Sequence, residues 1–134
     1  MTSFPLKIVT PDGLQYDGQA QQVTVRTTTG DVSILARHLN FVAPLGMGEA
    51  AILVDGQKRY AACIGGMISV VEGTVTLVPT TFEWADSIDT ARAEASQKRA
   101  EAVIADRKAT DMQIKLAEAR LKRALVRRGV AGKK

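Results

Sequence analysis

The stretch from Ser87 to Arg128 contains neither glycine nor proline, and this constrains the fold more than any other feature of the chain. Its alanines and charged residues recur at three- and four-residue spacing, which is typical of a helix and not of a strand. The sequence before Pro79 consists instead of short β-like runs separated by turn residues. The chain must therefore combine a β part with a helical tail, which places it in the α+β class.

The β part, residues 1–84, alternates apolar runs with strong turn signals. Pro11-Asp12-Gly13 and Asp55-Gly56 are typical turn and hairpin sequences. Turns that recur every 8–12 residues predict an antiparallel sandwich or a flattened barrel. Gly65-Gly66 predicts a bend or a close backbone approach, and Pro44 predicts an edge strand or a bulge. The expected strands are Phe4–Thr10, Leu14–Tyr16, Gln21–Thr27, Val32–Leu35, Val42–Leu45, Ala50–Val54, Gln57–Cys63, Met67–Val71 and Val75–Val78.

The tail, residues 85–134, reads as two helices. Asp86 or Ser87 can cap a first helix that runs to about Asp106. Thr110 begins a capping-box sequence, and the second helix is expected to end at Arg128 because Gly129 follows. A short connection predicts an antiparallel hairpin. The expected seam residues are Ile88, Ala91, Ala95 and Ala102 on the first helix and Ile114, Ala117, Leu121, Ala124 and Arg128 on the second.

A seam rich in alanine holds two helices together weakly, because alanine removes little apolar surface from water. The connector from Asp106 to Thr110 also lacks a helix breaker. We therefore expect a tail that can straighten into one helix of about 40 residues, roughly 60 Å long.

The positive charge of the chain is concentrated in this tail. Residues 1–84 carry five basic and seven acidic side chains, whereas residues 85–134 carry thirteen basic and seven acidic ones. A basic helix is usually a solvated surface, and otherwise it meets an acidic protein, a phosphate ligand, nucleic acid or an anionic membrane. The N-terminal residues show no signal-peptide pattern and no run is long enough to span a membrane, so a soluble protein is expected.

The residues give little support for catalysis or metal binding. His38 is the single histidine and Cys63 the single cysteine, so neither a nucleophile pair nor a metal-ligand cluster is evident. Arginines are more suggestive: Arg120, Arg123 and Arg127 form one stripe, and Arg92 and Arg99 form a second. These cations either favour a helix C-terminus and are otherwise solvated, or converge from two helices on a polyphosphate.

Four segments together carry a family resemblance: LKIVTPDG (6–13), GDVSIL (30–35) with His38 and VAPL (42–45), GGMISVVEGTVTLV (65–78) and SIDTARAEA (87–95). In this order they resemble the epsilon subunits of bacterial F-type ATP synthases, whose mitochondrial counterpart is called delta. The resemblance covers nearly the whole chain. It implies a sandwich of about ten strands followed by a two-helix hairpin.

The resemblance also implies a function. The protein would be a non-catalytic subunit of the central rotor stalk, peripheral to the cytoplasmic face of the bacterial cell membrane, and would help couple proton flow to ATP synthesis. The sandwich would contact the gamma subunit and the c-ring. The hairpin, once extended, would reach the alpha and beta subunits and inhibit ATP hydrolysis.

Site residues follow from the same resemblance. Some members of the family bind ATP as a regulatory ligand, with no required cofactor, through a motif I-D-x-x-R-A that is matched here by Ile88, Asp89, Arg92 and Ala93. Arg123 and Arg127 match arginines of the second helix that hold phosphates in those proteins. Asp31 and His38 match positions near the c-ring and gamma, although Ser33, Ala36-Arg37 and Leu39-Asn40 depart from the family pattern in that loop.

A free-standing nucleic-acid-binding module is the alternative, with the basic hairpin on the phosphates. The slightly acidic β part and the low aromatic content of 4% speak against it, because few side chains could stack on bases.

Overall fold

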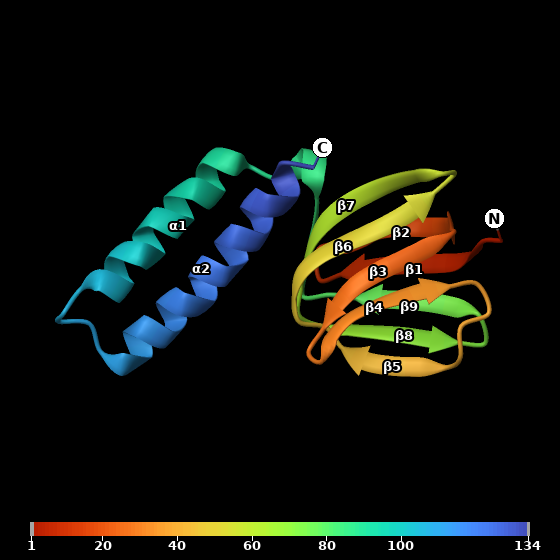
Figure 1. Cartoon of the computed structure of the whole chain (residues 1–134), viewed down its shortest axis with the longest axis horizontal. Coiled ribbons are helices and arrows are strands. Elements are labelled where there is room, and N and C mark those ends of the chain that lie inside the picture. The colour runs from red at the N-terminus through yellow and green to blue at the C-terminus, as the bar shows by residue number, and fades with distance from the viewer. Residues whose placement is uncertain (1, 134) are drawn as a thin grey trace.

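The structure is a computed structural model that describes residues 2–133, and it consists of a β-sandwich followed by a helical hairpin (Figure 1). The predicted fold class is confirmed. The strands are β1 (Phe4–Thr10), β2 (Gly13–Ala20), β3 (Gln22–Thr27), β4 (Gly30–Leu35), β5 (Phe41–Pro44), β6 (Met47–Val54), β7 (Gln57–Ile64), β8 (Met67–Val71), β9 (Thr74–Val78) and β10 (Thr81–Trp84). A 3-10 turn, η1 (Ala85–Ser87), leads into α1 (Thr90–Ala105) and α2 (Asp111–Ala131).

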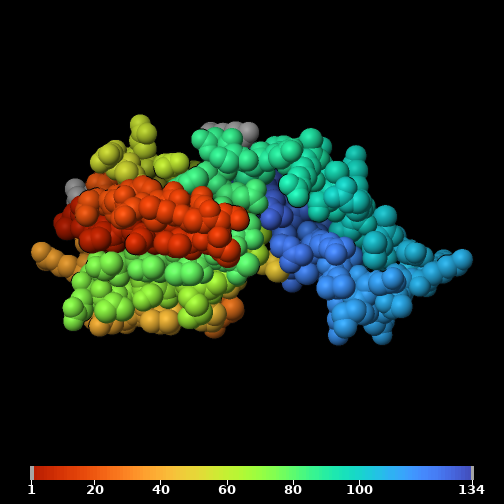
Figure 2. All heavy atoms as spheres, turned by 180° about the vertical axis from the view of Figure 1, so that it is seen from behind, coloured from red at the N-terminus to blue at the C-terminus, as the bar shows by residue number. Residues whose placement is uncertain are grey.

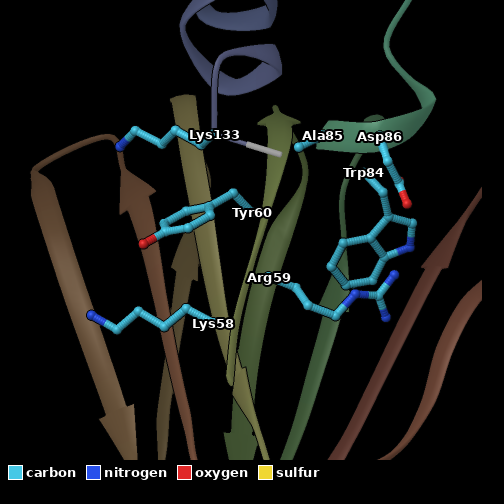
Figure 3. Close-up of a pocket in the computed structure, with 7 residues that line it drawn as sticks. All are labelled: Lys58, Arg59, Tyr60, Trp84, Ala85, Asp86 and Lys133. Carbon is cyan, nitrogen blue, oxygen red and sulfur yellow. The ribbon is translucent and has the colours of Figure 1, made fainter. Parts of the chain in front are cut away.

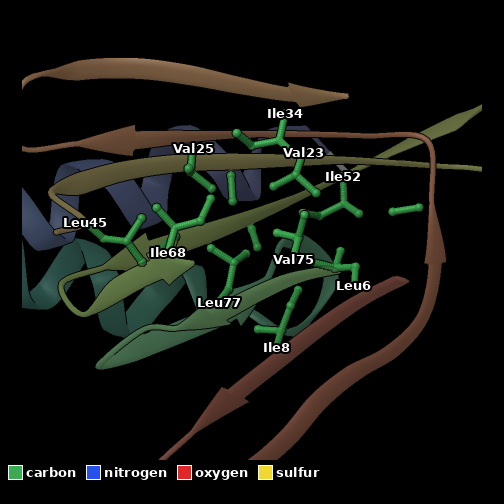
Figure 4. Packing of buried hydrophobic residues seen from close by; sticks show 14 of the residues in the cluster. Leu6, Ile8, Val23, Val25, Ile34, Leu45, Ile52, Ile68, Val75 and Leu77 are labelled. Atoms are coloured by element: carbon green, nitrogen blue, oxygen red, sulfur yellow. The ribbon is translucent and has the colours of Figure 1, made fainter. Parts of the chain in front are cut away.

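Two five-stranded sheets face each other across one core. Sheet A has the strand order β2-β1-β9-β8-β5 and sheet B the order β10-β7-β6-β3-β4. Apolar side chains of alternate residues point between the sheets, as Figure 4 shows for Leu6, Val23, Ile52 and Leu77. These residues are fully buried, and the two-residue period of a strand places their neighbours on the outer faces. This core forms without any side chain from the helices.

The sandwich departs from a purely antiparallel arrangement at one place. β1 pairs with β2 antiparallel on one side and with β9 parallel on the other, with Leu6 opposite Val75. Every other strand pair in the two sheets is antiparallel. The hairpin signals in the sequence could not show this pairing, because it joins strands far apart in the chain.

The predicted turn at Asp55-Gly56 and the predicted bend or close approach at Gly65-Gly66 are confirmed by their backbone conformation. Asp55 and Gly56 both have positive φ, 51° and 79°, which is the conformation of a tight two-residue hairpin turn. Gly66 has φ 94°, and a Cβ there would lie 2.0 Å from the Val78 carbonyl oxygen. The predicted close backbone approach at Gly65-Gly66 is therefore confirmed, and only glycine fits.

Two strand predictions need correction. Residues 81–84 were included in the β part but not expected to form a strand; they form β10, an edge strand antiparallel to β7. Pro79 interrupts the alternation of apolar residues just before this short strand, so the sequence did not indicate it. The return strand expected at Leu14–Tyr16 extends over Gly13–Ala20, because pairing with β1 overrides its polar composition. β5, which contains Pro44, is an edge strand as predicted.

The helix boundaries were predicted correctly at one end of each helix. Thr110 caps α2 and forms a complete capping box with Gln113, as expected. The cap of α1, however, is Asp89 and not Asp86 or Ser87, because residues 85–87 form η1. α2 also continues through Gly129 to Ala131. Packing of the last turn on the sandwich overrides the low helix propensity of this glycine.

The seam between the helices is made of alanine, but half of it differs from the prediction. Ala117 and Ala124 of α2 are buried as expected, whereas α1 buries Ala93 and Ala100. The expected seam residues Ala91, Ala95 and Ala102 are exposed. Alanines occur all around α1, so their spacing alone does not single out one face. Arg128, expected in the seam, is exposed and forms an ion pair with Glu94.

The hairpin is docked on the sandwich through the end of α2 and through Ile88, just before α1. Ile88, Val130 and Ala131 pack on Ala62 of β7 and Ala85 in a small buried cluster of their own. The rest of both helices projects away from the sandwich, as the space-filling view in Figure 2 shows. Within residues 2–133, neither helix is long and apolar enough to cross a membrane.

Candidate functional site

A cavity of about 400 Å³ lies where α1 leaves the sandwich, and most of the residues predicted to bind a ligand line it. Asp89, Arg92, Ala93 and Arg127 all contribute. The two arginines come from different helices, so the hairpin must be folded for them to share the cavity. Arg99, which the sequence placed in a stripe with Arg92, lines it too, together with Glu83, Ser87 and Ser96, which were not predicted to bind a ligand.

The N-terminus of α1 positions one side of this cavity. The Asp89 carboxylate accepts a hydrogen bond from the backbone N–H of Arg92 at 3.0 Å and so caps the helix. Ala93 is buried one turn further on. Ile88 does not line the cavity. It is 5% exposed and packs in the docking cluster with Val130, so the motif I-D-x-x-R-A contributes both to the cavity and to the attachment of the hairpin.

Arg127 already has a partner in the sandwich. Its Nε donates to Glu83 Oε1 at 2.7 Å, joining α2 to β10, and both side chains are about one third exposed (27% and 32%). A partly exposed pair of this kind contributes at most ~1 kcal/mol. An anion in the cavity would therefore compete with Glu83 for Arg127 at modest cost.

A second cavity, of about 450 Å³, continues along the seam. Arg99 of α1 and Arg120 and Arg123 of α2 line it, with Ala100 and Ala117 among the other lining residues. Ser96 and Arg99 border both cavities, so the two form one groove between the helices. The second cavity has no carboxylate among its lining residues.

Most of the arginines along this groove lack a counter-charge. Among residues 2–133, ion pairs are formed by Arg127 but not by Arg92, Arg99, Arg120 or Arg123. Unpaired guanidinium groups raised above an alanine floor suit phosphate groups, which they can bind through two parallel hydrogen bonds. The structure brings Arg92, Arg123 and Arg127 to one groove, while their assignment to ATP stays a prediction.

Another small cavity, on the other side of the junction, has a structural explanation. Figure 3 shows Arg59 against the Trp84 ring, 3.8 Å from its centroid, while Tyr60 lies between Lys58 and Lys133. The Lys133 amino group forms an ion pair with Glu49 of β6 at 2.7 Å, and this hydrogen bond raises the pKa of Lys133. These contacts close the sandwich edge and attach the last turn of α2.

The predicted subunit-contact residues Asp31 and His38 lie apart. Asp31, near the start of β4, forms an exposed ion pair with Arg26 at 2.7 Å. His38 follows the end of the same strand, where Nδ1 is 2.8 Å from the Leu39 carbonyl oxygen. They are therefore at opposite ends of β4 and do not form one site. Arg37 adopts φ 64°, so the turn keeps a left-handed conformation with arginine in it.

An apolar surface on sheet A was missed by sequence reasoning. The outer faces of β5, β8 and β9 expose Val42, Met67 and Val78, at 62%, 42% and 49%. Pro44, Met67 and Val78 are register partners and so form a row across these three strands. The row could not be read from the sequence, because it depends on the register of three strands, one of which is distant from the other two in the chain.

The single cysteine and the single histidine both make packing contacts. Cys63 is buried in the sandwich core, and burial raises the pKa of its thiol to about 12. His38 packs its ring edge-to-face on Phe41, with the ring centroids 6.0 Å apart. In the described part of the chain, no group of three or more His, Cys, Asp or Glu side chains is arranged to hold a metal ion.

Comparison with known proteins agrees with this architecture. The β-sandwich domain of the ATP synthase delta/epsilon chain matches residues 3–85, and the long α-helix domain of the same chain matches residues 86–132. The ATP synthase epsilon chain of Bacillus velezensis is 42% identical over 132 residues, covering 98% of this chain and 99% of that one. The epsilon chain of Ruminococcus albus is 41% identical over 136 residues, covering both chains in full.

Two solved structures have the same fold. A chain of the Euglena gracilis mitochondrial ATP synthase superposes with a TM-score of 0.79 at 20% identity, over 91% of this chain and 77% of that one. A chain of the Tetrahymena thermophila mitochondrial ATP synthase central stalk and c-ring gives a TM-score of 0.62 at 14% identity, over 95% of each chain. Taken together with the two matched domains and the full-length relatives, the sandwich and its helical hairpin show that this chain belongs to the ATP synthase delta/epsilon chain family.

Proposed function

We propose that this protein is the epsilon subunit in the central stalk of a proton-translocating ATP synthase, where it acts without catalytic residues of its own. The full-length similarity to ATP synthase epsilon chains carries this proposal. The sandwich supports it physically, because its core is complete without the helices and gives a rigid body that can transmit torque. The complex would hold it at the cytoplasmic face of the membrane, as a peripheral subunit.

The apolar outer face of sheet A is the surface that we assign to the gamma subunit. Val42, Met67 and Val78 expose large side chains there, and a stable protein interface has an apolar centre of this kind. We assign the contact with the c-ring to the loop around His38, where Leu39 is 83% exposed. Asp31 lies at the other end of β4 and would reach a different part of the stalk.

The hairpin is proposed as the regulatory element. Its docking rests on two large buried side chains, Ile88 and Val130, which contribute roughly 2 kcal/mol each. Released from the sandwich, residues 90–131 could form one helix about 60 Å long. Its arginines would then meet acidic surfaces of the alpha and beta subunits and block ATP hydrolysis.

ATP is the proposed ligand of the folded hairpin. Its phosphates would lie between Arg92 of α1 and Arg123 and Arg127 of α2, with Asp89 and Ala93 beside the base. Binding would neutralise arginines that otherwise repel each other across the seam. A ligand at 100 times its Kd stabilises the bound state by about 2.7 kcal/mol, which is comparable with the docking energy. The ATP concentration could thus decide whether the hairpin stays folded.

The regulatory role is tested with an ATP synthase core that lacks this subunit. Adding the full chain should lower the rate of ATP hydrolysis, whereas a chain that ends after Ala85, and so keeps β10 intact, should bind without inhibiting. Equal hydrolysis rates with both chains would refute the regulatory role. Failure of either chain to bind the core would refute the stalk assignment itself.

Calorimetric titration of the free protein tests the ligand. Arg127→Gln should weaken ATP binding about tenfold, the effect expected of one lost charge-assisted contact. Arg128→Gln is the matched control, because Arg128 is adjacent in sequence but points to Glu94 and Gln97 outside the groove. Equal losses in the two variants would show a general charge effect and not a site. The fluorescence of Trp84 would be a poor probe of ATP binding, since Trp84 lines the cavity on the other side of the junction.

A further inference from the structure

The groove between the helices extends beyond the residues assigned to ATP. Arg99 and Arg120, here called the outer arginine pair, line its second cavity and belong to no ion pair in the described part of the chain. Each is seven residues from an arginine of the first cavity, Arg92 on α1 and Arg127 on α2. Seven residues correspond to about 10 Å along a helix. Arg99 still borders the first cavity, and Arg120 carries the positive charge beyond it.

Helix electrostatics do not explain the outer arginine pair. Cations favour the last turn of a helix, but Arg99 and Arg120 lie in the middle of α1 and α2. Nor does pairing with acidic residues explain them: in the described part of the chain neither arginine forms an ion pair, and the second cavity, which both line, contains no carboxylate. Two arginines that line one cavity from facing helices repel each other, and an anion between them would relieve this repulsion.

The shape of the groove favours a thin, extended anion. Its floor is made of the buried alanines Ala93, Ala100 and Ala117, which leave room above the seam. Its walls are the arginines of both helices, in succession from Arg92 and Arg127 at the sandwich to the outer pair. Such a row of guanidinium groups is suited to phosphates that follow one another along a chain.

We propose that this groove binds linear phosphoanhydride chains longer than a triphosphate, with the outer arginine pair holding the phosphates beyond the third. The inference rests on the proposed nucleotide site for the orientation of the chain. The chemistry is shared by a nucleoside tetra- or pentaphosphate and by inorganic polyphosphate, which differ only in the capping nucleoside. A chain of this kind would hold both helices together along more of the seam than ATP does.

The test is a calorimetric titration of the full-length protein with ATP, adenosine pentaphosphate and inorganic polyphosphate, at one fixed salt concentration. The wild-type protein should bind the pentaphosphate more tightly than ATP. Arg120→Gln should weaken pentaphosphate binding about five- to tenfold, as for one partly exposed charge-assisted contact, and leave ATP binding nearly unchanged. Both phosphate chains should behave alike if the nucleoside plays no part at the outer pair.

Lys122→Gln is the matched control, since Lys122 is an exposed cation of the same helix that lines neither cavity. It removes the same charge and should affect the pentaphosphate and ATP equally little. Both positions are exposed, and an unchanged far-ultraviolet circular dichroism spectrum checks that the helices remain folded.

Two results would overturn the proposal: equal affinity of the wild type for ATP and pentaphosphate, or equal losses in the Arg120 and Lys122 variants. Equal losses in the two variants would instead favour an acidic protein surface as the partner of the outer arginine pair. If ATP failed to bind while polyphosphate bound through Arg120, the phosphate-chain groove would stand and the nucleotide assignment would fall. The two proposals can therefore fail separately.

Discussion

Replacing Val130 with alanine should release the hairpin without harming the sandwich. Val130 is 2% exposed and belongs to the small docking cluster, which shares no residue with the core between the sheets. Losing two methyl groups and leaving a partial cavity costs about 1.5–2 kcal/mol. This is a large part of a docking energy that depends on Val130, Ile88 and two partly exposed ion pairs. The population with an undocked hairpin should rise by roughly 10- to 30-fold.

Amide hydrogen exchange measured by mass spectrometry reports this release segment by segment. Exchange in α2 should accelerate by the same factor, whereas exchange in β1 and β9 should stay at the wild-type rate, because local opening does not require global unfolding. Leu125→Ala is the control, since Leu125 is 48% exposed and outside the cluster. Gly129→Ala should act in the opposite direction. A Cβ there meets no atom within 4 Å, and alanine stabilises a helix interior by about 1 kcal/mol relative to glycine. Unchanged protection of α2 in Val130→Ala, or a loss shared equally with β1 and β9, would refute the separate docking of the hairpin.

Three further predictions concern individual residues. Thr110→Ala should lose the capping box and destabilise the start of α2 by about 1 kcal/mol. Amide hydrogen exchange should then be faster only in the first turn of α2, and an unchanged rate there would contradict the role of the cap. Gly66→Ala should destabilise the sandwich by several kcal/mol in urea unfolding, because its Cβ would overlap the Val78 carbonyl. Gly73→Ala is the control: Gly73 has φ 81° but open space around it, so the substitution should cost only about 1 kcal/mol. The pKa of the buried Cys63 thiol is raised from 9.0 to about 12, so the folded protein holds this proton more tightly than the unfolded chain does. Its contribution to stability should be complete below pH 9 and disappear as the pH rises toward 12, and urea unfolding of Cys63→Ala should lack this part of the pH dependence.

Sequence reasoning found the features that local chemistry determines. Alternation and turn residues located nine of the ten strands, and the hairpin at Asp55-Gly56 and the capping box at Thr110 follow from residues close together in the chain. What it missed depends on packing between distant segments. The parallel pairing of β1 with β9, the strand β10 and the passage of α2 through Gly129 each require a partner that the local sequence does not reveal.

The candidate site divides in the same way. The spacing of the arginines on each helix indicated a basic stripe, and the resemblance identified Asp89, Arg92 and Ala93 as a group. Which face of α1 meets α2 could not be read from a helix with alanine on all sides, and so the continuous groove between the helices was not expected. Glu83 was overlooked because β10 was not recognised as a strand, although its carboxylate is the ion-pair partner of Arg127.

The parallel pairing of β1 with β9 also orders the events of folding. β1 can pair with β2 as soon as both are made, but sheet A cannot close until residues 74–78 have emerged to fill the place between β1 and β8. Such a long-range contact is slow to form. A loop of more than sixty residues must close, at a cost in chain entropy, before the strand pairing contributes any stability. β10 and Ala85 follow only then, and they complete the surface on which Val130 and Ala131 dock. During synthesis, the helices would therefore emerge onto a finished sandwich, and the element that is last to attach is also the one that can detach without disturbing what came before.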